Sequence, residues 1–177
     1  MEIKRVGVVG CGLMGSGIVE VCARSGYDVR VMEVNQEFLD RGLGRIRASI
    51  ERAVERGRVT AEDRDATLGR ITGTTDLADF SDVDYVIEAV REDLAEKKAI
   101  FSTLSRVTPA HAILATNTSS LSVAEMAAVT DRPAQVLGMH FFSPANIMRL
   151  LEIVRGKATA KDTLATAMAI ARRIGKV

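Results

Sequence analysis

The pattern of apolar and polar positions predicts strands that alternate with helices along the whole chain. Short, β-branched apolar runs predict strands over 3–9, 27–32, 85–89, 112–116, 135–139 and 150–154. Helical periodicity predicts helices over 13–24, 37–56, 60–70, 93–106, 123–128 and 161–173. This alternation is typical of an α/β fold with a doubly wound, mostly parallel sheet. Two consecutive helices follow the second strand, so we expect a helical hairpin excursion over about 37–70.

Three glycines follow the first predicted strand at the spacing of a dinucleotide-binding loop. Gly10, Gly12 and Gly15 form a GxGxxG motif directly before a predicted helix. The first glycine permits a tight turn, the second lets a pyrophosphate approach the backbone, and the third lets the helix pack on the strand. Free amides at the start of the helix would face the phosphates. An ordinary strand-to-helix turn is the alternative, but the flanking elements favour dinucleotide binding.

An acidic residue, Glu33, ends the second predicted strand. Its carboxylate could accept hydrogen bonds from the adenosine ribose hydroxyls, and it would repel the 2′-phosphate of NADP. The three residues that follow, 34–36, offer no guanidinium, so the pattern favours NAD over NADP. A solvated charge at the strand end is the alternative interpretation. Flavin dinucleotides use a similar loop and acid, so these features alone do not separate NAD from FAD.

Composition narrows the class of protein. The 177 residues are 47% apolar, carry a net charge of +1, and include two tyrosines, five phenylalanines and no tryptophan. No basic stretch is interleaved with aromatic residues, so we expect no nucleic-acid partner. No apolar run is long enough to cross a bilayer, and a strand begins at once, so we expect a cytoplasmic protein without a membrane partner. Cys11 and Cys22 are expected to be free thiols.

Polar residues at or near strand ends are candidates for the chemistry. The segment 117–120 follows one predicted strand, His140 follows another, and Glu152 interrupts the apolar run 150–154. A carboxylate in such a run must be solvated, neutralised or paired. Paired with His140, it would form a general base that takes a proton from an alcohol while the carbon gives a hydride to nicotinamide. The alternatives are a structural histidine and a helix cap at 117–120. His111 is expected to be an exposed loop residue.

Four segments then resemble one family. In order and separation they are similar to segments of the NAD-binding domain of L-3-hydroxyacyl-CoA dehydrogenases, which include bacterial 3-hydroxybutyryl-CoA dehydrogenases. The four segments are VGVVGCGLMGSGI, VIEAVRED, ATNTSSL and GMHFFSPANIMRLLEIV. The resemblance covers essentially the whole chain, and the NTSS and HFFSP blocks make it specific. It implies an NAD-dependent oxidoreductase that reversibly oxidises an L-3-hydroxyacyl-CoA to the 3-ketoacyl-CoA. It implies no metal.

The resemblance also implies roles for individual residues. His140 would be the catalytic base, Glu152 its orienting carboxylate, and Ser119 a donor to the substrate oxygen. The implied cofactor contacts are Gly10, Gly12, Leu13, Met14, Gly15, Glu33, Glu92, Lys97, Asn117, Ser119 and Ser143. Two of these depart from the family pattern. Glu33 stands where the family usually has Asp, and Ser143 stands where much of it has Asn, so a shorter hydrogen-bonding group remains.

An arginine stripe on the first helix of the excursion suggests where coenzyme A would bind. Arg41, Arg45, Arg52 and Arg56 share one helical face, with Ser49 beside them and apolar residues opposite. A solvated helix face is the alternative interpretation. The resemblance implies that Ser49 and Arg56, the latter in place of a lysine, contact coenzyme A, and that Ser119 completes the substrate-binding set.

The family continues beyond the region matched by this chain. Its further helices supply a catalytic-site Asn, close the acyl pocket and form most of a dimer contact, whereas the sequence ends at Val177. We therefore expect residues 1–177 to be one NAD-binding domain that binds NAD but turns over poorly, and the full-length protein to be a homodimer. An acyl carrier protein thioester as substrate, or a non-catalytic NAD-binding module, are the alternatives.

Overall fold

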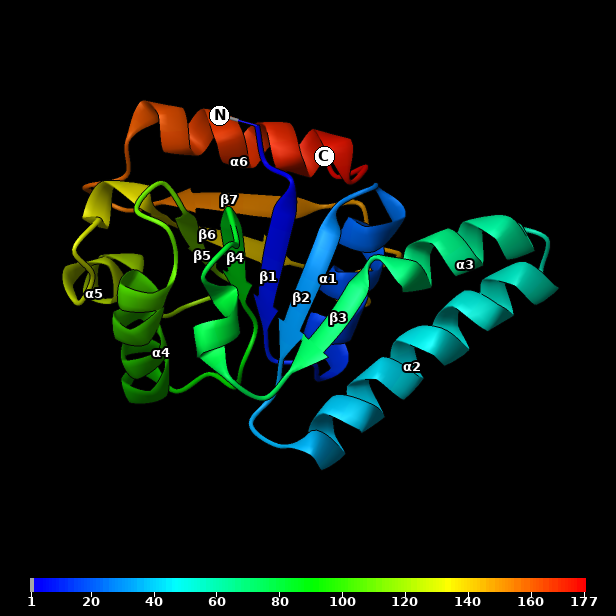
Figure 1. Cartoon of the computed structure of the whole chain (residues 1–177). Coiled ribbons are helices and arrows are strands. Elements are labelled where there is room, and N and C mark those ends of the chain that lie inside the picture. Colours follow the sequence, from blue (N-terminus) through cyan, green and yellow to red (C-terminus); the bar gives the residue numbers. More distant parts are fainter. Residues whose placement is uncertain (1) are drawn as a thin grey trace.

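The computed structural model describes residues 2–177 and contains one seven-stranded sheet. Its strands are β1 (Arg5–Val9), β2 (Asp28–Met32), β3 (Ile71–Thr74), β4 (Tyr85–Glu88), β5 (Ile113–Thr116), β6 (Val136–Phe141) and β7 (Leu151–Arg155). They lie in the order β3-β2-β1-β4-β5-β6-β7 (Figure 1). Every pair is parallel except β6 with β7. The predicted doubly wound, mostly parallel α/β fold is confirmed.

The helices begin close to the predicted positions because the sequence carries recognisable caps. They are α1 (Leu13–Arg24), α2 (Gln36–Glu55), α3 (Ala61–Gly69), α4 (Leu94–Val107), α5 (Val123–Ala128) and α6 (Lys161–Arg173), with 3₁₀ turns η1 (Leu77–Phe80) and η2 (Pro133–Gln135). The side chains of Asn35, Thr60, Asp93 and Ser122 accept amide hydrogen bonds at the starts of α2, α3, α4 and α5. Such caps satisfy amides that lack a partner within the helix.

Helices cover both faces of the sheet. One apolar cluster joins α1 and α6 to the sheet through residues such as Ile18 and Ile170. The other joins η1, α4 and α5 through Phe80, Phe101 and Met126, all fully buried. Two covered faces explain why the central strands are apolar at nearly every position instead of alternating. The crevice for a ligand is then left to the carboxyl ends of the parallel strands.

The predicted helical excursion is present and lies against the glycine loop. Figure 1 shows α2 and α3 as a helical pair that extends outward beyond β3. Leu39, Ile46 and Ile50 of α2 are buried. A Cβ added at Gly42 would lie 2.4 Å from Cys11 Sγ, so α2 passes too close to the loop for any larger residue. The excursion is therefore positioned by contact with the loop that follows β1.

The main differences from the sequence prediction concern three strands. The short strand β3 was not predicted, because Ile-Thr-Gly-Thr lacks a continuous apolar run, and it forms by pairing with β2. β1 begins at Arg5 instead of residue 3. β6 continues through His140 to Phe141, beyond residue 139, because these two residues pair with β7. His140 is thus held within a strand and not in the loop after it.

Cys11 and Cys22 are free, as predicted, and both are buried. Burial raises the pKa of each thiol to about 12, so both are protonated at neutral pH. Within residues 2–177, no helix has both the length and the apolar character required to cross a membrane. Val177 exchanges backbone hydrogen bonds with Arg149 and Leu151.

Candidate active site

The glycine loop has the geometry that its spacing predicts. Gly10 has φ of +94°, which favours glycine, and a Cβ at Gly15 would lie 1.9 Å from the Gly10 carbonyl oxygen. Nothing lies within 4 Å of where a Cβ of Gly12 would be, so the backbone there is open to a close ligand. No side chain caps the start of α1, and its first turn carries no acid. These free amides can bind a phosphate.

Glu33 is held in place by backbone amides on both sides. Its Oε1 accepts a hydrogen bond from the Cys11 amide at 2.8 Å, and its Oε2 accepts one from the Val34 amide at 3.0 Å. Each carboxylate oxygen retains capacity for a second donor. The side chain is half-buried and lines a cleft, so a ribose hydroxyl could approach it.

That cleft, which we call the apolar cleft, has a volume of about 690 Å³. It lies at the carboxyl ends of β1, β2 and β4 and is lined in part by Glu33, Val34, Phe38, Leu77, Val90 and Ile100. An apolar pocket beside the fixed Glu33 carboxylate suits a flat aromatic base attached to a sugar.

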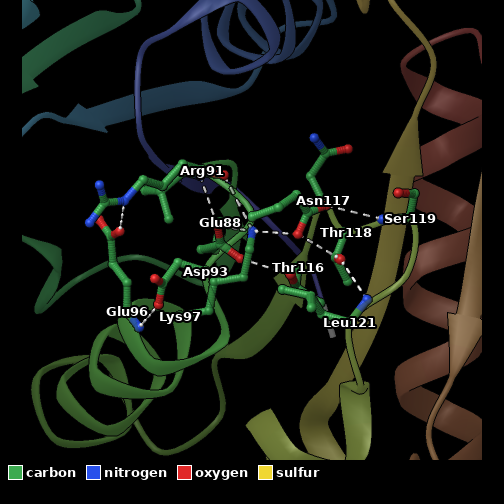
Figure 2. A network of polar contacts seen from close by, with 12 residues as sticks. Glu88, Arg91, Asp93, Glu96, Lys97, Thr116, Asn117, Thr118, Ser119 and Leu121 are labelled. Carbon is green, nitrogen blue, oxygen red and sulfur yellow. Dashed lines mark hydrogen bonds and ion pairs between the residues drawn. The ribbon is translucent and has the colours of Figure 1, made fainter.

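A buried ion pair lies at the carboxyl end of β4, next to the apolar cleft. Lys97 of α4 and Glu88 at the end of β4 both have fully buried side chains, and Lys97 Nζ lies 2.6 Å from Glu88 Oε1. Glu88 also accepts hydrogen bonds from the Val90 amide and the Thr116 hydroxyl, each at 2.7 Å (Figure 2). The carboxylate therefore ties α4, the loop after β4 and the end of β5 together.

The turn after β5 is linked to the same group of residues. Lys97 Nζ is 3.9 Å from Glu92, whose carboxylate accepts hydrogen bonds from the Thr118 hydroxyl at 2.9 Å and the Ser119 amide at 3.3 Å. Figure 2 shows Thr118 also accepting a hydrogen bond from the Leu121 amide. The helix cap considered as the alternative for 117–120 is instead supplied by Ser122, at the start of α5. Ser119 itself is exposed at this turn. Its backbone is fixed while its hydroxyl remains available.

Strand pairing brings His140 and Glu152 together. They are direct partners in the antiparallel β6–β7 register, and His140 Nδ1 lies 3.4 Å from Glu152 Oε2. Their side chains are 22% and 55% exposed, so the pair lies at the rim of the crevice. The amide of Phe141, next to His140, donates to Asn117 Oδ1 at 2.8 Å and joins β6 to the turn that carries Ser119. The arrangement can hold an imidazole beside a hydroxyl donor, which suits proton transfer to and from an alcohol.

A second cleft lies between α1 and α2. This arginine cleft has a volume of about 460 Å³ and is lined in part by Arg24, Arg45, Arg52, Arg56 and Arg58. Ser49 lies among them on α2, and Asn146 comes from the loop between β6 and β7. Several guanidinium groups around one cleft favour an anionic ligand such as a phosphate ester.

Some predicted site residues lie apart from these clefts. Lys97 is fully buried and faces acidic side chains, so its ammonium is covered by protein. Ser143 is exposed just after β6 and is not among the residues around either cleft. Arg41 pairs with Glu37 at 2.6 Å outside the arginine cleft. His111, expected in an exposed loop, has a half-exposed side chain and pairs with Asp84 at 2.9 Å.

Sequence reasoning missed two polar residues of this region. Glu88 interrupts the apolar run 86–90, the same signal that drew attention to Glu152, and this signal could have identified it. Asn146 carries no comparable signal, because its contacts are with α1 and α2, far away in the sequence.

The fold and the site together define a class of protein. The chain has the features of a nicotinamide-dependent dehydrogenase domain. These features are a Rossmann-type sheet, a glycine loop before an uncapped helix, an acid at the end of β2 and a histidine–carboxylate pair at the crevice.

Comparison with known proteins gives the family. The family described as "3-hydroxyacyl-CoA dehydrogenase, NAD binding domain" matches residues 5–177, and the chain belongs to it. A 3-hydroxybutyryl-CoA dehydrogenase of Mycobacterium tuberculosis is 52% identical over 158 residues, which are 89% of this chain and 55% of that protein. A probable 3-hydroxybutyryl-CoA dehydrogenase of Bacillus subtilis is 44% identical over 176 residues, 99% of this chain and 61% of that protein.

Solved structures agree with this assignment. The crystal structure of 3-hydroxybutyryl-CoA dehydrogenase from Escherichia coli has a TM-score of 0.97 and 40% identity, and the match covers 99% of this chain and 37% of that one. The chain thus spans roughly half to three fifths of the two curated relatives named above. The family resemblance seen in the sequence is confirmed, and NAD is the cofactor of this domain family.

Proposed function

We propose that this chain is the cofactor domain of an NAD-dependent dehydrogenase that reversibly oxidises an L-3-hydroxyacyl-CoA to the 3-ketoacyl-CoA. The observation that carries the proposal is the register pairing of His140 with Glu152 at the crevice rim. The names of the relatives, 3-hydroxybutyryl-CoA dehydrogenases among them, support the same reaction.

The protein's own residues account for the proton and the developing charge. Bound NAD supplies the hydride acceptor for the carbon that carries the hydroxyl. His140 takes the hydroxyl proton during oxidation and returns it during reduction. Glu152 stabilises the resulting imidazolium through the 3.4 Å contact. Ser119, on a turn fixed by Glu92, donates to the substrate oxygen in both directions.

Cofactor binding follows from the loop and the apolar cleft. The amides at Gly12, Leu13 and Met14 start α1 and would bind the pyrophosphate, with Gly10 and Gly15 shaping the turn. Glu33 would accept bonds from the adenosine ribose. Glu92, Asn117 and Ser143 would contact the nicotinamide half, and buried Lys97 would contribute by holding Glu88 and Glu92.

The arginine cleft is the proposed coenzyme A site. Ser49 and Arg56 both line it, as the family resemblance implies, together with further arginines able to bind phosphates. An acyl carrier protein thioester remains the alternative substrate. Residues 1–177 would form one domain, and the full-length protein would be a cytoplasmic homodimer.

The test uses full-length protein containing this chain, with 3-hydroxybutyryl-CoA and NAD. We expect His140→Gln to lower kcat by about 10²–10⁴-fold, because the proton acceptor is lost. Its NADH affinity, measured by fluorescence titration, should match that of the wild type. A variant with normal turnover would exclude His140 as the base and favour the non-catalytic NAD-binding module. A yellow chromophore in the purified protein would instead indicate a flavin enzyme.

A further inference from the structure

Asn146 joins three elements around the arginine cleft. It lies on the loop between β6 and β7, and its Nδ2 donates to Glu20 Oε2 of α1 and to Ser49 Oγ of α2, each at 3.0 Å. All three residues line the cleft. The loop that starts immediately after the strand of His140 is therefore bonded directly to the helical excursion.

Glu20 determines which way the Asn146 amide points. The Glu20 side chain is 3% exposed, and its other oxygen lies 3.5 Å from Arg24 Nη1. An ionised carboxylate only accepts hydrogen bonds, so the amide oxygen of Asn146 would be repelled at that position. The NH₂ group must face Glu20, and the contact with Ser49 is then made by the same NH₂ group.

This orientation fixes the role of the Ser49 hydroxyl. Ser49 Oγ accepts from Asn146, so its own hydrogen is directed elsewhere. Across residues 2–177, the hydrogen bonds of the structure include no acceptor for that hydrogen. Ser49 is half-buried and lines the cleft, so a ligand atom can approach it. The ligand atom that fits is an acceptor, such as a carbonyl or phosphate oxygen.

We propose that Asn146 is a positioning residue for the thioester substrate: together with Glu20 it holds Ser49 as a hydrogen-bond donor to an acceptor oxygen in the coenzyme A portion. This inference rests on the proposed function, because it places coenzyme A in the arginine cleft. Glu20 orients Asn146, Asn146 orients Ser49, and Ser49 contacts the ligand. A ligand bound in this cleft would also affect the loop that follows β6, because Asn146 lies on that loop and contacts Ser49.

The test is a double-mutant cycle on free coenzyme A affinity, measured by isothermal titration calorimetry. We expect Ser49→Ala and Asn146→Ala each to weaken binding by about 5- to 10-fold, the effect of one lost hydrogen bond. The double variant should be no weaker than Ser49→Ala alone, because Asn146 acts through Ser49. Glu20→Gln keeps the side-chain shape and removes the repulsion that orients the amide. It should give a smaller loss that also disappears in the Ser49→Ala background.

Controls separate this role from a general effect on folding. NADH affinity and the thermal midpoint are measured for every variant, and NADH affinity should stay within about twofold, since the apolar cleft is a different site. Ser81→Ala, a serine outside both clefts, should bind coenzyme A like the wild type. Additive losses from Asn146→Ala and Ser49→Ala, or unchanged affinity in Asn146→Ala, would overturn the role of Asn146 while leaving the proposed function intact. A wild-type protein that binds NADH but no coenzyme A would overturn both.

Discussion

Two acid–base pairs near the crevice differ sharply in burial and in distance. Lys97 and Glu88 are fully buried and 2.6 Å apart, and Glu88 also accepts bonds from Thr116 and the Val90 amide. His140 and Glu152 are 22% and 55% exposed and 3.4 Å apart, with the single contact between them. The first pair is surrounded by protein, and the second is open to solvent.

The difference in burial and distance suits the two pairs to different roles, one structural and one in the proposed proton transfer. A buried ion pair is costly to form and still more costly to break, so it fixes the elements that it joins. A proton-transferring pair must exchange a proton with substrate, and such contacts are often long before substrate binds and tighten afterwards. The buried pair therefore holds the loop after β4 and the end of β5 in place, while the exposed pair retains the freedom that its proposed role in proton transfer requires.

The largest expected effect comes from removing one member of the buried pair. Lys97→Met should lower the free energy of unfolding by about 3–5 kcal/mol, because Glu88 would remain buried without its cation. Urea denaturation monitored by circular dichroism measures this loss. Thr116 and the Val90 amide would still donate to Glu88, but neither supplies a positive charge.

A second substitution provides the control for Lys97→Met. Adding Glu88→Gln removes the unpaired charge and retains an oxygen that can accept from Thr116, so the double variant should be more stable than Lys97→Met alone. If the free energy of unfolding of Lys97→Met lay within about 1 kcal/mol of that of the wild type, the buried pair would contribute no more to stability than an exposed pair does.

A smaller effect on stability is expected at the rim pair. Glu152→Gln should change the free energy of unfolding by less than about 1 kcal/mol, because the carboxylate is more than half exposed. In the full-length protein the same change should lower kcat at least about tenfold, because the imidazolium loses its counter-charge. Stability and turnover are measured on the same preparation. A stability loss as large as that of Lys97→Met would remove the distinction between the pairs.

The smallest effect is expected at a third pair, His111 with Asp84, at the opposite end of the sheet. Burial alone would raise the pKa of Asp84, but bonds from the Arg5 and Lys4 amides and from His111 lower it below its ordinary value. A carboxylate with a lowered pKa in the fold stabilises the protein above its ordinary pKa. This contribution is lost as the pH falls through the folded value.

Asp84→Asn tests this dependence on pH. The difference in unfolding free energy between wild type and variant should narrow as the pH falls from about 5 to below about 4. Urea unfolding at a series of pH values measures it. A difference in unfolding free energy that is the same at pH 3 and pH 5 would contradict the lowered pKa of Asp84.

Most of the fold could be predicted from the sequence, because local signals mark most elements. The caps Asn35, Thr60, Asp93 and Ser122 and the glycine loop place helix starts within a residue or two. β3 could not be predicted, since its four residues form a strand only by pairing with β2. The two residues that extend β6 likewise depend on a partner strand.

The candidate site shows the same division. His140 and Glu152 were predicted to pair from a charge within an apolar run, and the register brings them into contact. Helical spacing places Arg41 on the same face of α2 as the other arginines, yet Arg41 lies outside the arginine cleft. The extent of the cleft depends on where α1 packs against α2, which helical spacing does not reveal. Asn146 was missed because its partners, Glu20 and Ser49, are brought to it by tertiary packing.

The reversed direction of β7 explains how Glu152 comes to lie beside His140. In a sheet of uniform direction, the opening residues of a strand lie at the edge away from the ligand, and Glu152 is the second residue of β7. Because β7 is antiparallel to β6, its first residues instead lie at the edge of the sheet where the parallel strands end, and Glu152 is placed opposite His140. A single-residue insertion early in β7 would turn the carboxylate to the other face of the sheet, whereas loop 142–150 could change length without moving it.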